Sequence, residues 1–287
     1  MTAQAVQPLR AALRRAPLHV VLLGLCAVWL VPTVGLLVSS FRPPRLVPVS
    51  GWWTALVPPY QFTLQNYRQV LDAYSMGRSF LNSLFITIPA TIIPVIVAAY
   101  AAYAFAWMRF RGQEVLFTIV VGSLVIPLQM TLIPVLRLFT ALGLAGTFPA
   151  VWLAHTGYGL PFAIYLLRNF LGALPRDLLE SAAIDGAAPL TVFVRLILPL
   201  SVPAIASLVI FQFLWVWNDL LVALIYVGGA PQVAPMTVTV SHLVSSLGQN
   251  WQLLTAAAFI SMVLPLAVFF SLQQFFVRGI LAGAVKG

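Results

Sequence analysis

Long uncharged apolar runs dominate this sequence. No charged residue lies between Arg78 and Arg109, and none lies between Asp219 and Arg278. An apolar run of about 18 residues is long enough to cross a membrane as a helix, and the second interval is far too long for one span. The composition agrees, since 61% of the residues are hydrophobic and 7% are charged. The chain is therefore predicted to be an all-α, multi-pass membrane protein.

The order of these runs predicts six transmembrane helices. The first is expected from Leu18 to Phe41 and the second between Arg78 and Arg109, with an amphipathic helix over residues 64–73 in the connecting segment. The third and fourth are expected over residues 115–136 and 138–167, separated by a turn around Arg137 and residues 142–146. Pro127 and Pro134 are predicted to kink the third helix. The loop that divides the fifth helix from the sixth is marked by Gly228, Gly229, Pro231, Pro235 and Gly248.

The positions of the basic residues predict the orientation in the membrane. The net charge is +9, but most Lys and Arg residues lie between apolar runs, so we do not expect nucleic-acid binding. More Lys and Arg residues lie near the N-terminus, after the even-numbered spans and at Lys286 than in the remaining loops. The positive-inside rule then predicts that both termini are cytoplasmic.

Residues that carry catalysis are sparse. His19, His155 and His242 lie on different spans or loops, and the single Cys26 excludes a disulfide framework. The zinc-protease, nucleophile-elbow and phosphate-loop motifs are absent, so the chain is predicted to be neither an enzyme nor an ATP-binding subunit. We expect the chain itself to bind no cofactor and no metal.

Residues 174–200 form a charged island between the apolar runs. Pro175 suits the first turn of a helix, and Leu178, Leu179, Ala182 and Ala183 recur at the spacing of one helical face. Gly186 is expected to end this helix in the left-handed conformation, and Pro189 is expected to begin a second helix that runs to Leu198 and Pro199. The pattern predicts a helix, a glycine turn and a second helix.

This segment resembles the coupling motif of ABC-transporter permeases. The matching residues are Glu180, Ser181 and Ala182, then Gly186, and then Leu196, Leu198 and Pro199, with Ser181 and Leu196 as mild departures from the usual alanine and isoleucine. The resemblance implies that two partner ATPase subunits, which use ATP and Mg, contact this segment. The implied contact residues are Glu180, Ser181, Ala182, Asp185 and Gly186.

Four further stretches resemble the smaller permease subunit of maltose and alpha-glucoside importers. They are Asn82-Ser83, residues 101–106, Trp217-Asn218-Asp219 in the expected fifth span, and residues 279–287. The resemblance implies a type I ABC importer permease fold in the bacterial cytoplasmic (inner) membrane. The implied partners are a second, homologous permease, the two ATPase subunits, an extracytoplasmic sugar-binding protein and membrane lipid.

The expected organisation follows from these matches. An anchor helix with an external segment (residues 1–76) precedes a five-helix permease core (77–278) that contains the coupling segment, and a cytoplasmic tail (279–287) ends the chain. Gly283 and Lys286 are expected to contact the ATPase pair in a flexible, small-residue strip, and Trp217, Asn218 and Asp219 are expected to line the translocation path. The expected function is ATP-driven import of an oligosaccharide or alpha-glucoside by alternating access.

Other transport classes remain as alternatives. An ABC importer could carry another solute, such as glycerol phosphate or a compatible solute. An ion-coupled secondary transporter should carry intramembrane acids, and Asp219 is the only acid placed within a predicted span. A membrane-embedded enzyme would need clustered His, Asp or Glu residues, which the sequence lacks.

Overall fold

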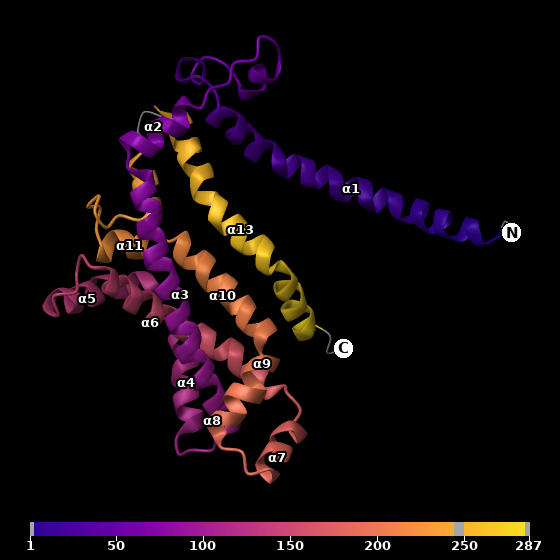
Figure 1. Ribbon diagram of the computed structural model, residues 1–287, viewed down its shortest axis with the longest axis vertical. Coiled ribbons are helices and arrows are strands. Elements are labelled where there is room, and N and C mark those ends of the chain that lie inside the picture. The colour runs from indigo at the N-terminus through magenta and orange to yellow at the C-terminus, as the bar shows by residue number, and fades with distance from the viewer. Residues whose placement is uncertain (1–2, 244–249, 285–287) are drawn as a thin grey trace. The chain divides into compact units, whose positions relative to one another are not determined.

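The protein is helical throughout the part that the structure describes. The computed structural model describes residues 3–243 and 250–284, and within them the side chains of residues 16–178, 180–182, 184–243 and 250–273. Every regular element in these ranges is a helix (Figure 1). Four helical segments are long and apolar enough to cross a membrane: Ala16–Ser40, Met76–Trp107, Phe148–Gly172 and Trp251–Gln273. Two bent helix pairs raise this number to six if each pair is one span, so the predicted fold class is confirmed.

The chain divides into two compact units. Unit 1 comprises Met1–Tyr74 and Leu243–Ile260, and unit 2 comprises Ser75–His242 and Ser261–Gly287. Unit 1 contains α1 (Ala3–Ser40), the short 3-10 helices η1 (Pro44–Leu46) and η2 (Trp52–Leu56), α2 (Gln65–Ala73) and the start of α13 (Trp251–Ala284). The amphipathic helix predicted over residues 64–73 is therefore confirmed as α2.

A buried arginine organises the loop that follows α1. Arg42 is 2% exposed, and its guanidinium donates to the carbonyl oxygens of Ser50 at 2.8 Å and Leu46 at 3.0 Å, and also to the hydroxyl of Ser50. The amide of Asn66 on α2 donates at 2.8 Å to the carbonyls of both Ser40 and Arg42. Since unpaired buried carbonyls are costly, these donors fix the loop's path. Arg42 therefore has a structural role in the loop between α1 and α2.

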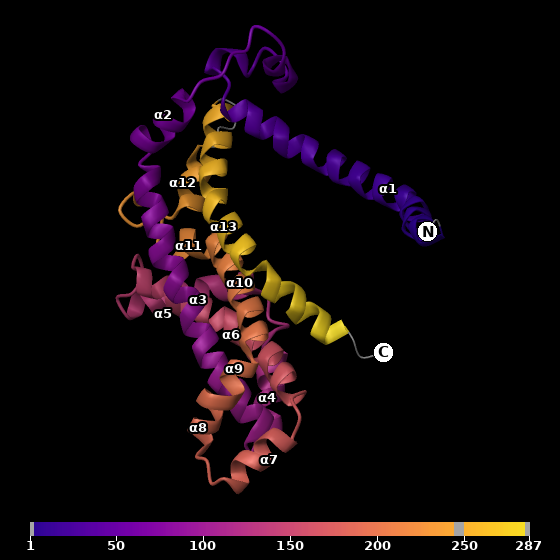
Figure 2. The same cartoon turned by 45° about the vertical axis from the view of Figure 1, so that its right-hand side comes forward.

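Unit 2 holds the remaining helices, which Figure 2 shows from a second direction. They are α3 (Met76–Trp107), α4 (Gln113–Ser123), α5 (Leu128–Ala141), α6 (Phe148–Gly172), α7 (Asp177–Ile184), α8 (Pro189–Val192), the π-helix η3 (Phe193–Ile197), α9 (Leu198–Leu200), α10 (Val202–Trp217), α11 (Leu221–Tyr226) and α12 (Met236–His242), followed by the rest of α13.

The core of unit 2 forms where α3, α6 and α10 pack together. Ala98 and Ala102 of α3 have no exposed area, and Ala163 and Leu167 of α6 are each 1% exposed. Small residues let two helix backbones approach closely. In a membrane the hydrophobic effect does little to drive helices together, because lipid tails are as apolar as the side chains, so this close packing stabilises the contact. Leu208 of α10 completes this cluster, so the three helices form one packed body.

The third predicted span is broken in the structure. Helices α4 and α5 meet at an angle of 102°, and Pro127 occupies the N-cap position of α5. A proline lacks the N–H that an uninterrupted helix requires, so the break falls where the sequence predicted a kink. The turn predicted at residues 142–146 is confirmed, because the chain turns there at Gly143 and Gly146, which both have positive φ. Its extension to Arg137 is wrong, because Arg137 lies inside α5.

Asn82 and Ser83 hold the segment before α12 against α3. The Asn82 amide donates to the carbonyls of Gln232 at 3.2 Å and Ala234 at 3.1 Å, and the Ser83 hydroxyl accepts the N–H of Met236 at 2.8 Å. One turn before, the hydroxyl of Ser79 is 2.7 Å from that of Thr239. This polar row fixes the loop that follows α11.

Candidate functional site

The coupling segment contains the predicted glycine turn. Gly186 has φ +68°, and the N–H of Ala187 donates to the carbonyl of Ala182 at 3.0 Å. This is the long bond of a Schellman motif, in which the residue after a left-handed glycine closes the end of the helix. Ala188 then leads into Pro189 at the start of α8. The predicted sequence of helix, glycine turn and helix is confirmed.

The second coupling helix contains a widened turn that the sequence did not indicate. α8 ends at Val192, and the chain continues through the π-helix η3 into α9, which ends at Leu200. The predicted end near Leu198 and Pro199 is therefore close to the observed end. A π-helical turn inserts one extra residue, and such turns are frequent at functional sites.

Tyrosines of α3 anchor the second coupling helix. The Tyr103 hydroxyl donates to the carbonyl of Pro189 at 3.2 Å, and the rings of Tyr100 and Tyr103 lie 4.7 and 5.2 Å from the Phe193 ring. Ala102, beside Tyr103, has no exposed area. The run at 101–106 thus gives α3 a closely packed face and an anchor for the coupling segment.

The exposed face of the coupling segment combines acids with two apolar side chains. Glu180, Ser181 and Asp185 are exposed, and Ala182 is partly buried against the core of unit 2. Ile184 is 85% exposed and Leu190 is 62% exposed. Figures 1 and 2 show α7 and α8 at the same end of unit 2. The five predicted coupling residues therefore lie together on one projecting element.

The Trp217-Asn218-Asp219 run lies at the end of α10. The helix ends at Trp217, so Asn218 is its C-cap residue and Asp219 follows it; that the three residues line the translocation path within the fifth span stays a prediction. Trp217 is 2% exposed, and its indole donates to the carbonyl of Ser261 on α13 at 3.1 Å. The Asn218 amide donates to the carbonyl of Leu214 in its own helix at 2.7 Å. Trp217 therefore ties α10 to α13.

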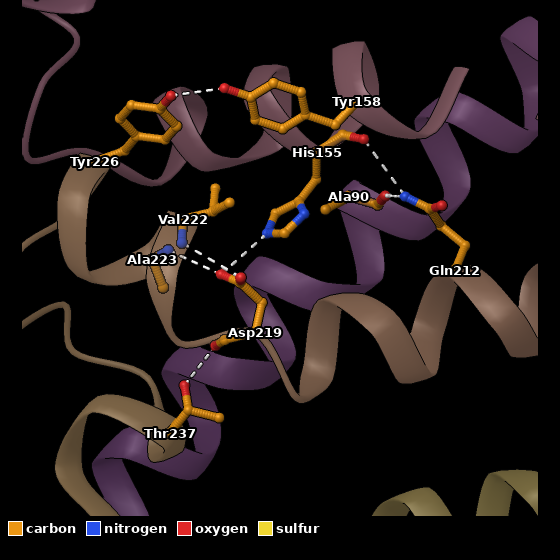
Figure 3. Close-up of polar contacts among 9 residues, drawn as sticks. All are labelled: Ala90, His155, Tyr158, Gln212, Asp219, Val222, Ala223, Tyr226 and Thr237. Carbon is orange, nitrogen blue, oxygen red and sulfur yellow. Dashed lines mark hydrogen bonds and ion pairs between the residues drawn. The ribbon is translucent and has the colours of Figure 1, made fainter. Parts of the chain in front are cut away.

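The carboxylate of Asp219 caps the next helix. It accepts the N–H groups of Val222 at 3.3 Å and Ala223 at 2.9 Å in the first turn of α11. Its main-chain carbonyl accepts the Thr237 hydroxyl of α12 at 2.7 Å (Figure 3). A carboxylate at a helix N-terminus satisfies free N–H groups and is favoured by the helix dipole. Asp219 thus joins the end of α10 to both α11 and α12.

His155 lies against Asp219, a contact that the placement of the three histidines on different spans or loops did not indicate. His155 on α6 has no exposed area, and its Nε2 atom lies 3.6 Å from Oδ2 of Asp219 (Figure 3). Its ring meets the Trp215 ring edge to face at 5.0 Å. An ionisable group in a membrane span normally faces a polar partner, and this rule was the available signal for pairing His155 with Asp219.

Hydroxyl groups continue this cluster toward α5. The hydroxyls of Tyr158 on α6 and Tyr226 on α11 are 2.8 Å apart (Figure 3). The Thr131 hydroxyl donates to Tyr158 at 3.0 Å, and Tyr226 donates to the carbonyl of Leu132 at 3.3 Å. These bonds connect the broken third span to α6 and α11. No local sequence pattern indicates these bonds, because the partners are far apart along the chain.

The C-terminal tail is helical as far as it is described. α13 continues to Ala284, so the expected flexible strip is wrong for the backbone of Gly283. Lys286 lies outside the described residues. The contact of both residues with an ATPase pair remains a prediction.

Metal-binding geometry is not found in the described part of the chain. Within it, no group of three or more His, Cys, Asp or Glu side chains lies close enough to hold a metal ion.

Comparison with known proteins identifies the family. Residues 95–281 match the family described as "Binding-protein-dependent transport system inner membrane component". The chain belongs to this family. It is therefore an inner-membrane permease component of an ABC transport system and not an enzyme.

Two relatives of this permease are similar over most of its length. It is 59% identical over 276 residues to the osmoprotective compounds uptake permease protein GgtD of Synechocystis sp., covering 95% of this chain and 93% of the relative. It is 55% identical over 241 residues to the alpha-glucoside transport system permease protein AglG of Rhizobium meliloti, covering 82% of this chain. The match spans 63% of the length of AglG.

A solved structure confirms the fold of the permease. A chain of a bacterial ABC transporter involved in the import of the acidic polysaccharide alginate superimposes with a TM-score of 0.78. The alignment covers 93% of the permease and 98% of that chain, with 22% sequence identity. The likeness at this identity establishes the type I importer fold.

Proposed function

We propose that the permease forms half of the translocation path of an ATP-driven importer of alpha-glucosides or related oligosaccharides. A second, homologous permease forms the other half, two ATPase subunits bind below, and an extracytoplasmic sugar-binding protein delivers the cargo. Both termini are proposed to be cytoplasmic. The observation that supports coupling to ATPase subunits most directly is the exposed helix pair around Gly186.

The coupling segment has the features of a docking element. Ile184 and Leu190 are large, apolar and mostly exposed in the chain alone, although they lie within the charged island. Side chains that fill a partner's pocket at the buried centre of an interface supply most of its free energy, whereas exposed charges at its rim supply little. We assign Ile184 and Leu190 to the buried centre of the contact, and Glu180, Asp185 and Ser181 to its polar rim.

Anchoring by α3 allows this contact to move the membrane helices. Coupling requires an element whose position differs between two states of the ATPase dimer. Because Tyr103 binds Pro189 and packs on Phe193, a displacement of α8 is transmitted to α3. The core then carries it to α6 and α10, which supports an alternating-access cycle.

The names of the relatives support a neutral glucoside as the cargo. One relative is named for osmoprotective compounds and the other for alpha-glucosides. An alpha-glucoside that also protects against osmotic stress would satisfy both names. A compatible solute of another class is the second candidate, because the first relative's name does not specify a sugar.

Uptake into vesicles tests this proposal. The chain would be purified with its co-purifying subunits, reconstituted into vesicles, and supplied with ATP and the binding protein. We expect ATP-dependent uptake of maltose or trehalose that a proton ionophore does not reduce. Uptake of glycine betaine or glycerol 3-phosphate in place of the sugars would refute the cargo class. Ionophore-sensitive uptake without ATP would refute the ABC mechanism.

A further inference from the structure

A small polar pocket lies in the loop between α1 and α2, within unit 1. Its volume is about 200 Å³, below the roughly 300–1,000 Å³ usual for small-molecule sites, so it has room for one compact group and not for an oligosaccharide. All of its lining residues are described, and none of them is acidic. They are Arg42, Leu46, Ser50, Thr54, Ala55, Val57, Pro58, Pro59 and Gln61.

Arg42 brings a positive charge to the wall of this pocket without a negative partner. The side chain is 2% exposed, and all of its acceptors are neutral carbonyls and hydroxyls, including Oγ1 of Thr54 at 3.4 Å from Nη2. Its Nε atom is buried and has no acceptor among the described residues. The only acid before residue 75 is Asp72, which is exposed on α2. Because a buried charge without an opposite charge is costly, the pocket favours an anion.

The pocket lies at the level where α1 leaves the hydrocarbon layer. A Cβ at Gly35 of α1 would lie 2.7 Å from Nε1 of Trp52, so the Trp52 ring packs directly on this glycine. Gly35 is 19 residues after Ala16, the first residue of the candidate span. At about 1.5 Å per residue this is roughly 28 Å, close to the hydrocarbon thickness of about 30 Å. Thr54 follows Trp52 in η2, which places the pocket among the lipid headgroups.

Apolar and aromatic side chains surround the charged pocket on the surface of the loop. Val57, which lines the pocket, is 60% exposed, and the neighbouring Trp53 and Tyr60 are 62 and 64% exposed. Trp and Tyr are enriched at membrane interfaces, where one part of the ring contacts lipid and another contacts water. The combination of a buried cation with exposed apolar side chains therefore fits a ligand that is both anionic and apolar.

We infer that this pocket binds the headgroup phosphate of an anionic phospholipid at the end of α1. The guanidinium of Arg42 suits phosphate oxygens, and Thr54 and Gln61 offer further donors. The acyl chains then lie along Val57 and the exposed face of α1. An acidic side chain of another protein would supply the same charge. A protein that binds and dissociates, however, leaves Arg42 unpaired for part of the transport cycle, whereas lipid is always present.

Photo-crosslinking to a lipid headgroup tests the inference, which does not depend on the cargo. The assembled importer, without its binding protein, would be placed in phosphatidylcholine nanodiscs that contain phosphatidylglycerol with a diazirine in its headgroup. We expect crosslinks within residues 42–61, mapped by mass spectrometry. Unlabelled phosphatidylglycerol in about tenfold excess should lower crosslinking about tenfold by mass action. Inorganic phosphate at the same excess should not lower it.

Thr54→Glu is the test variant. It places a carboxylate within reach of Arg42, so the loop keeps its guanidinium and the pocket no longer needs an external anion. Loss of a hydrogen bond between charged groups should lower crosslinking at least about tenfold. The matched control is Gln69→Glu, which adds the same charge at an exposed position of α2 outside the pocket and should keep wild-type crosslinking. If Thr54→Glu does not assemble, Arg42→Gln removes the charge and gives the same comparison.

Three outcomes would overturn the inference. Crosslinks outside residues 42–61, or equal crosslinking of wild type and Thr54→Glu, would show that the lipid binds elsewhere. Inorganic phosphate that competes as well as phosphatidylglycerol would assign the pocket to a free anion. Absence of lipid crosslinks, together with weaker attachment of the binding protein to Thr54→Glu, would assign the pocket to an acidic side chain of that protein.

Discussion

Two glycines with the same backbone conformation allow the coupling turn to be tested. Gly186 and Gly143 both have φ +68°, and a Cβ at either position would meet no atom within 4 Å. Valine in this conformation costs about 1–2 kcal/mol at each position. We expect Gly186→Val to reduce uptake and the stimulation of ATP hydrolysis, and Gly143→Val to retain both. Both variants should lose similar thermal stability and insert normally. Equal transport losses would show that the Gly186 effect is general destabilisation.

Asp219 allows the helix cap to be separated from the contact with His155. Asparagine accepts hydrogen bonds at a helix N-terminus almost as well as aspartate, whereas alanine costs about 0.5–2 kcal/mol there. We expect Asp219→Ala to lower the free energy of unfolding by at least this amount, because it also leaves the buried His155 without its partner. Asp219→Asn should recover most of the loss. Thermal unfolding in detergent measures both. If Asp219→Asn is as unstable as Asp219→Ala, the charge near His155 is the larger contribution.

Among the elements, the coupling helix α7 offers a direct test of docking. Glu180 is exposed in the chain alone, and we predict that it pairs with a basic side chain of an ATPase subunit. An exposed pair contributes only about 0–1 kcal/mol, whereas breaking a desolvated pair costs about 3–5 kcal/mol. Glu114, which is exposed in the first turn of α4, is the matched control. We expect Glu180→Ala, but not Glu114→Ala, to weaken co-purification of the ATPase.

Ionic strength distinguishes the two kinds of pair at Glu180. Salt screens exposed pairs strongly and buried pairs weakly. The difference between wild type and Glu180→Ala should therefore persist at high salt if the pair is desolvated. If Glu180→Ala assembles and transports like wild type at every salt concentration, Glu180 is a solvated surface acid.

Elements that depend on local chemistry were predictable from the sequence. The turn at Gly186 and the start of α8 at Pro189 follow from glycine's access to positive φ and from the fixed φ of proline. The break beside Pro127 was predicted for the same reason. The position of Arg137 inside α5 was not predicted, because an arginine at a span boundary and an arginine inside a short helix have the same local sequence signal. The size of the 102° bend between α4 and α5 depends on packing against other helices, which the local sequence does not show.

Contacts across the chain were the part that the sequence could not supply. His155 and Asp219 lie 64 positions apart, and a single sequence read by itself does not indicate which distant residues are in contact. Gln212 likewise bonds to the carbonyls of Ala90 and His155, which lie 122 and 57 positions away in the chain. The rule that intramembrane polar groups seek partners predicted that such contacts exist, but it did not identify them.

At the scale of the whole molecule, the C-terminus offers a second test of coupling. The helix α13 brings the backbone to Ala284, and resemblance to maltose-type permeases predicts that the following residues contact the ATPase pair. Deleting residues 282–287 should leave insertion and partner assembly intact, because the core of α3, α6 and α10 is untouched. Coupling free energies are typically about 1–3 kcal/mol, so sugar imported per ATP hydrolysed should fall by at least about fivefold. Simultaneous measurement of uptake and phosphate release in vesicles gives this ratio. As a control, a chain in which residues 282–287 are replaced by six serines tests whether length alone suffices. A deleted chain with the full-length ratio would show that the tail is an ordinary terminus, and coupling would then rest on the segment around Gly186.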